Sequence, residues 1–282
     1  MEMKNLFKEI RKNIFVVSGL FIITFFVSIA IFAPYVAPHD PLELNMANRS
    51  EGGFWVGNSN YILGTDMLGR CILSRIIYGA RISLLVGTIA VTIIFTFGTV
   101  LGLISGYIGG TVDLVIMRFT DIMLSFPNIL LAIAIMAALG PNIFNAVIAL
   151  VVTGTPRIIR FVRGSVLAVK EEEYLSAARA LGIPLFRILF LHILPNIMPN
   201  IMILASLNLG QSILYLASLG FLGLGIQPPT PEWGVMISEG SDYLILGQWW
   251  LATFPGMCIT MATLGYVFLG RGLRDILDPR LK

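Results

Sequence analysis

Six long apolar runs constrain this chain more than any other feature of its sequence. Hydrophobic residues make up 56% of the 282 residues and charged residues only 12%, against about 25% charged in ordinary soluble domains. A helix needs about 20 apolar residues to cross a bilayer, and the runs are close to or above that length. They extend over residues 14–33, 84–104, 112–139, 143–159, 197–219 and 248–269. We therefore predict an all-α membrane protein with six transmembrane helices.

The distribution of basic residues predicts how these helices are oriented. Four Lys or Arg precede the first run, six lie within 157–187 and four follow Gly270, which puts 14 of the chain's 19 on one side of a six-span arrangement. Because cytoplasmic loops carry the excess of Lys and Arg, we expect both termini to be cytoplasmic. The loop 220–247 has no Lys or Arg but contains Glu232, Glu239 and Asp242, as expected outside.

The first outer loop, residues 34–82, conflicts with this orientation because it carries four arginines. They are Arg49, Arg70, Arg75 and Arg81. From Leu68 onward an apolar face is opposed by a polar one, which is typical of a helix lying in the membrane interface. The apolar face consists of Ile72, Leu73, Ile76 and Ala80, and the polar face of Arg70, Ser74 and Arg81. The alternative is that this segment simply extends the second span.

The third run, 112–139, carries charges near its start. Arg118 and Asp121 are three residues apart, so they can pair on one helix face and reduce the cost of burying charge. The alternative is that both side chains reach the headgroups. Pro127 lies within the run and is expected to kink the helix.

The polar segment from Lys170 to Asn196 separates the fourth and fifth runs. Its first part predicts an amphipathic helix, with an apolar face at i, i+3, i+4 and i+7. That face consists of Tyr174, Ala177, Ala178 and Leu181, opposite Glu172, Ser176 and Arg179. Gly182 is expected to end this helix in the left-handed conformation, and Pro184 to begin a second one. Pro195 is expected to end the second helix before the fifth span.

The residues of this segment resemble the Glu-Ala-Ala cytoplasmic loop of ABC-importer permeases. The matching positions are Glu173, Ala177, Ala178, Gly182, Arg187, His192, Leu194, Pro195 and Asn196, whereas Ile183, Pro184 and Leu191 depart from the usual pattern. The resemblance implies that residues 164–196 form a two-helix cytoplasmic coupling elbow between the fourth and fifth spans. In that family the loop docks into a groove on the ATPase subunit.

Two further segments resemble the dipeptide, oligopeptide and nickel branch of the same permeases. They are LGTDMLGRCILSRIIYGARISL at 63–84, with Cys71 in place of a usual aspartate, and FLGLGIQPPTPEWG at 221–234; the tail 277–280 is similar. The resemblance implies a second related permease, two ATPase subunits and an external substrate-binding protein, in a bacterial or archaeal inner membrane. It also implies two parts, 1–83 (tail, first helix and outer loop) and a permease core at 84–282. The expected cargo is di- or oligopeptides, with nickel or a metal chelate as the alternative.

The sequence offers no enzyme site of its own. It has no G-x-x-x-x-G-K-[ST] phosphate loop, so ATP and Mg²⁺ are expected on the partner ATPases and no cofactor in this chain. Cys71 and Cys258 are far apart, and His39 and His192 are the only histidines, so no metal site is expected. The basic residues form no run with interleaved aromatics, which argues against nucleic acid. A self-contained ion-coupled carrier is the alternative of another class, although it predicts intramembrane acidic residues or inverted repeats.

One polar stripe falls inside the fifth run. Its residues recur at i, i+3, i+4 and i+7 and are Asn208, Gln211, Ser212 and Tyr215. Amides at this depth are costly unless they face water or a polar partner. The stripe therefore predicts either hydrogen bonds to a neighbouring helix or, the interpretation we favour, a wall of the substrate pathway.

Overall fold

The computed structural model describes residues 11–277, and within that range the chain is largely helical. Lys4, Lys8 and the tail beyond Leu277 lie outside the described residues. The long helices are α2 (Ile14–Ile31), α4 (Ile72–Ile108), α7 (Ile143–Val169), α10 (Leu194–Phe221) and α12 (Trp250–Leu277). The shorter ones are α3 (Ala33–Val36), α5 (Gly110–Leu124), α6 (Asn128–Leu139), α8 (Glu173–Ala180), α9 (Leu185–Arg187) and α11 (Trp233–Ser241).

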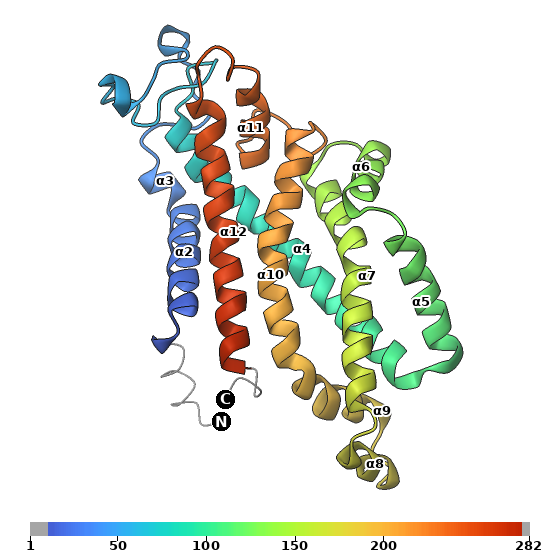
Figure 1. The fold of residues 1–282 in the computed structure, drawn as a ribbon. Helices are drawn as coiled ribbons and strands as arrows, with labels where there is room; N and C mark the ends of the chain where they lie inside the picture. Colours follow the sequence, from blue (N-terminus) through green and yellow to red (C-terminus); the bar gives the residue numbers. More distant parts are fainter. Residues whose placement is uncertain (1–10, 278–282) are drawn as a thin grey trace.

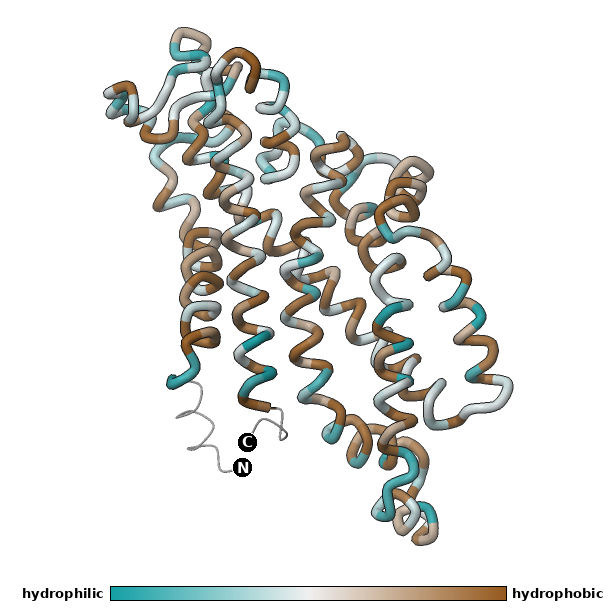
Figure 2. The backbone as a smooth tube through the Cα atoms, in the orientation of Figure 1, coloured by the Kyte–Doolittle hydropathy of each residue, from teal (hydrophilic) through white to brown (hydrophobic). Residues whose placement is uncertain are grey.

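Five helices in the described range are long and apolar enough to cross a membrane. They are α2, α4, α7, the continuous helix from Leu185 to Phe221, and α12. α5 and α6 pass the same test together, which raises the number of candidate spans to six. Hydrophobic residues dominate the long helices, and hydrophilic residues lie mainly in the connecting segments, at helix ends and at a few places along α7 and α10 (Figure 2). The start of α2, the end of α12 and α8 lie at one end of the bundle, opposite α3 and α11 (Figure 1). The all-α class is thus confirmed for the described residues, with five to six spans.

Glycines allow α4 and α7 to pack closely. Three glycines of α4, spaced four residues apart, face branched side chains of α7, and an added Cβ would lie 2.7–2.8 Å from the partner's Cβ. The pairs are Gly98 with Ile158, Gly102 with Val162 and Gly106 with Val166. Lipid tails are as apolar as the helices, so the hydrophobic effect does not drive helix association in a bilayer. Close van der Waals packing at small residues drives it instead. This contact fixes the position of α7 beside α4.

The interfacial helix predicted from Leu68 is wrong. α4 begins at Ile72 and continues for 37 residues to Ile108, so the alternative is correct: the segment extends the second span. The apolar face faces protein rather than lipid headgroups, since Ile72, Ile76 and Ala80 join a buried cluster with Trp233 of α11. Residues 83 and 84, the expected boundary between two parts of the chain, lie within this helix.

Arg118 and Asp121, whose spacing would allow an ion pair on one helix face, do not pair with each other. Asp121 pairs instead with Arg160 of α7, and Asp113 pairs with Arg163 at 2.6 Å. Both carboxylates of α5 thus pair with arginines of α7. The spacing of residues along one helix cannot predict such pairs between helices. The predicted kink at Pro127 is present, but it is a full break between two helices: α5 and α6 meet there at an angle of 89°.

Candidate coupling and translocation sites

Residues 164–196 form a hairpin at one end of the bundle, from the last turns of α7 through α8 and α9 to the start of α10 (Figure 1). Gly182 ends α8 with a φ of +70°, the left-handed conformation that the sequence predicts. Its N–H donates to the Arg179 carbonyl at 3.0 Å, and the Ile183 N–H donates to the Ala178 carbonyl at 3.1 Å. These two bonds form the Schellman arrangement, which satisfies carbonyls at a helix end. No described atom lies within 4 Å of an added Cβ at Gly182, so the backbone conformation alone requires glycine there.

The buried face of α8 differs from the predicted apolar face. Leu175 and Ala178 are the buried residues, and Leu175 joins the cluster formed by Ile188 and other residues of the following segment. Tyr174 and Leu181, which the pattern assigns to the apolar face, are 42% and 79% exposed. The position of α8 over the next segment decides which side is covered. The other residues expected in coupling are arranged as follows: Glu173, Ala177 and Arg187 are exposed, and His192 is half-buried.

Pro195 does not end the second helix, so that prediction is wrong. A π-helical segment, Ile188–Ile193, joins α9 to α10, and the chain stays helical from Leu185 to Phe221. Pro195 occupies the first turn of α10, where its missing N–H costs least. The wider π turn also changes the local hydrogen-bond pattern and accommodates such an interruption. The second helix of the hairpin and the fifth span are therefore parts of one continuous helix.

The four polar residues of α10 line one small cavity of about 30 Å³. Ser212 is 5% exposed, donates to the Leu209 carbonyl at 2.8 Å and approaches the Gly87 carbonyl of α4 at 3.4 Å. Asn208 donates to the Leu204 carbonyl at 2.8 Å, and Gln211 lies 3.4 Å from the Tyr215 hydroxyl. Ser212 thus contacts a neighbouring helix, whereas the other three are half-buried with hydrogen bonds inside α10.

The opposite walls of this cavity come from three other helices. They are Val91 and Ile94 of α4, Asn128 at the start of α6, and Leu150, Thr153, Gly154 and Arg157 of α7. Sequence reasoning treats Arg157 as a marker of the exit from the fourth span and misses its place beside the stripe. Arg157 lies near the middle of α7, about 21 Å from Ile143 at a rise of 1.5 Å per residue. Within residues 11–277, no cluster of three metal-ligating side chains occurs.

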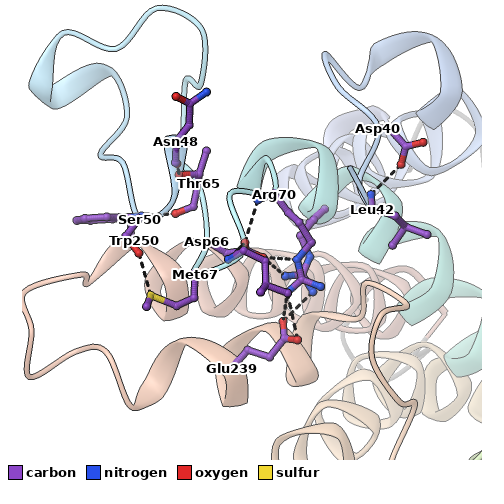
Figure 3. A network of polar contacts seen from close by, with 12 residues as sticks. Asp40, Leu42, Asn48, Ser50, Thr65, Asp66, Met67, Arg70, Glu239 and Trp250 are labelled. Atoms are coloured by element: carbon purple, nitrogen blue, oxygen red, sulfur yellow. Dashed lines mark hydrogen bonds and ion pairs between the residues drawn. The ribbon is translucent and has the colours of Figure 1, made fainter. Parts of the chain in front are cut away.

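An ion-pair network holds the other end of the molecule together (Figure 3). Arg70 donates to Asp66 at 2.6 Å and to Glu239 of α11 at 3.2 Å. Arg75 donates to the same two acids, at 2.7 Å for Glu239. The arginines are 4% and 1% exposed. Together the four residues border a cavity of about 330 Å³ between the first outer loop, α11 and α12. Two of the four arginines within residues 34–82 are therefore paired with acids, which reduces the conflict between this segment and the expected orientation.

Comparison with known proteins identifies the chain's relatives. Residues 98–282 match the family model described as binding-protein-dependent transport system inner membrane component, and residues 3–52 match the N-terminal TM domain of oligopeptide transport permease C. The chain is 48% identical over 276 residues to a dipeptide transport system permease protein from Alkalihalophilus pseudofirmus, covering 98% of this chain and 89% of the relative. It is 42% identical over 282 residues to a di/tripeptide transport system permease protein from Pseudomonas aeruginosa, covering 99% and 93%.

A third relative bears a different name. The chain is 41% identical over 273 residues to a glutathione transport system permease protein from Pectobacterium atrosepticum, covering 97% of this chain and 89% of the relative. Full-length identity at this level, together with a family match over more than half of the chain, identifies the family. The chain belongs to the inner-membrane components of binding-protein-dependent transport systems.

Proposed function

We propose that this chain is one of two membrane subunits of an ATP-driven importer and forms half of a pathway for di- or oligopeptides. The relatives named for dipeptides and for di- and tripeptides support a peptide cargo. The main support for a pathway is the cavity at mid-bundle that Asn208, Gln211 and Arg157 line together. Polar groups at this depth require water or a polar partner, and a passing peptide supplies one. A second, related permease would complete the pathway.

The hairpin at residues 164–196 is the proposed contact with an ATPase subunit. Glu173 and Ala177 of α8, and Leu181 directly after it, are exposed and available to a partner. The chain has no phosphate-loop motif, so ATP and Mg²⁺ belong on two ATPase subunits. Because the helix from Leu185 to Phe221 is continuous, a movement imposed beside the hairpin is carried along it to Asn208 and Gln211. This is the rigid-element coupling that alternating access requires.

The proposed location is a bacterial or archaeal inner membrane, with the hairpin end in the cytoplasm and α11 facing the external binding protein. Cysteines at Glu172 and at Ile245, which is 94% exposed, test this orientation in a background without Cys71 and Cys258. An impermeant thiol reagent added to intact cells should label position 245 and spare position 172. Labelling of both positions from outside would contradict the orientation.

Reconstitution tests the function itself. The chain would be purified with its partner permease and ATPases, placed in liposomes and supplied with the binding protein and radiolabelled dialanine. We expect accumulation that requires ATP and binding protein together. Uptake that continues without ATP would instead support an ion-coupled carrier.

A further inference from the structure

Arg157 differs from its neighbours on α7 in its ionic contacts. Arg160 pairs with Asp121 and Arg163 pairs with Asp113, both on α5. Arg157 forms no ion pair with any residue in the range 11–277, and its side chain is exposed in the single chain. A charge this far along a membrane helix is expensive, and it persists where it faces a partner or a water-filled path.

The surroundings of Arg157 favour an anion. The cavity that it borders is lined by the side chains of Asn128, Thr153, Asn208 and Gln211, and the described lining contains no Asp or Glu. An anion entering there meets one guanidinium and several amides without repulsion. The enclosed volume of about 30 Å³ holds one or two waters. In this conformation, therefore, the site admits a small terminal group and not a whole peptide.

We propose that Arg157 is a carboxylate subsite of the pathway and binds the free C-terminal carboxylate of the transported peptide. This inference rests on the proposed function. The planar guanidinium donates two parallel hydrogen bonds to a carboxylate, which a lysine or an amide cannot reproduce. Asn208 and Gln211 of α10 lie across the cavity, where their amides can bond the adjacent peptide unit. Every di- or oligopeptide with a free terminus presents this carboxylate, so the subsite recognises the class without reading its side chains.

The test compares dialanine with dialanine amide, which lacks the terminal charge, in liposomes containing the complete complex. The binding protein can hold the two compounds to different extents, so the fraction of binding protein that carries each compound is measured by fluorescence. Uptake of each compound is then divided by that fraction. The variants are Arg157→Gln, Arg157→Lys and, as a matched control, Arg160→Gln. Arg160 lies one turn away and is also an exposed arginine of α7, but it already pairs with Asp121 and does not border the cavity.

We expect Arg157→Gln to reduce dialanine uptake roughly tenfold, since charge-assisted hydrogen bonds are lost, and to leave dialanine amide unchanged. Arg157→Lys should lose less, and Arg160→Gln should resemble the wild type. Equal loss of both substrates with reduced complex yield would assign Arg157 to packing against the second permease and overturn the subsite. Uptake by Arg157→Gln equal to that of Arg160→Gln would overturn it too. If the wild-type complex imports neither compound, peptide import itself fails, and the subsite with it.

Discussion

Arg75 of α4 and Glu239 of α11 lie 164 positions apart in the chain and form an ion pair of 2.7 Å. Arg75 is 1% exposed, so its charge is largely removed from water. Desolvation costs several kcal/mol per ion and is offset only by opposite charges in close contact, which Glu239 and Asp66 supply. The pair therefore joins the start of α4 to α11, and Asp66 adds the loop that precedes α4 to the same network.

Breaking this network should destabilise the protein strongly. Asp66→Asn leaves Arg70 and Arg75 with half of their negative partners, and we expect a loss of about 3 kcal/mol. The measurement is the thermal or denaturant stability of the purified complex. Asp242→Asn is the matched control, because Asp242 borders the same cavity but is exposed and forms no ion pair within residues 11–277. Equal stabilities of the two variants would contradict the role of the network.

Glu232 should make stability depend on pH. Burial raises the pKa of its carboxyl above the usual value near 4.5, although Ser83 and the Val235 N–H donate to it at 3.1 and 3.0 Å. The folded state binds a proton at this carboxyl more tightly than the unfolded state does. The protonated carboxyl therefore makes its full contribution to stability below about pH 4.5. The contribution is lost as pH rises through the raised pKa.

Glu232→Gln provides the comparison, since glutamine keeps the shape and cannot titrate. The melting temperature of the wild type should fall relative to that of Glu232→Gln as pH is raised from about 5. Parallel curves over the whole range would show that Glu232 titrates with an ordinary pKa in the folded state.

Gly182→Val should uncouple ATP hydrolysis from substrate. A left-handed residue costs roughly 1–2 kcal/mol once it carries a side chain, and more if it is β-branched, so α8 and α9 should lose their relative placement. Substrate-stimulated ATP hydrolysis by the complex is the measurement. Gly140→Val is the matched control, because Gly140 also has a positive φ, of +85°, and open space around it but lies between α6 and α7, outside the hairpin. Normal coupling in Gly182→Val at normal expression would rule out the hairpin geometry as a requirement.

The stripe on α10 should divide into two functions. Asn208→Leu and Gln211→Leu are expected to leave complex yield and melting temperature unchanged while uptake fails or changes substrate preference, because both amides border the cavity. Ser212→Ala is expected to keep uptake and lose a helix contact of about 0.6 kcal/mol, since Ser212 faces Gly87. Lower melting temperatures with intact uptake in the leucine variants would assign the whole stripe to helix packing.

The sequence by itself determined the features that depend on local composition. Apolar runs of sufficient length predict membrane helices because an unpaired backbone cannot remain in lipid, and five to six such spans are present. The left-handed Gly182 and the break at Pro127 also follow from single-residue conformational preferences. The motifs at 63–84 and in the hairpin indicate the family through their residues alone.

Tertiary structure decided which charges meet and which faces are covered. Asp121 selects Arg160 over Arg118, and Arg70 and Arg75 are neutralised by Glu239, because the partners lie on helices far away in sequence. The same holds for α8, where packing on the π-helical segment buries Leu175 and leaves Leu181 exposed. Arg157 borders the same cavity as the stripe of α10 because α7 packs beside α4 and α10, a placement that no single helix specifies. Contacts between helices depend on their relative rotation and depth, and periodicity along one helix contains neither.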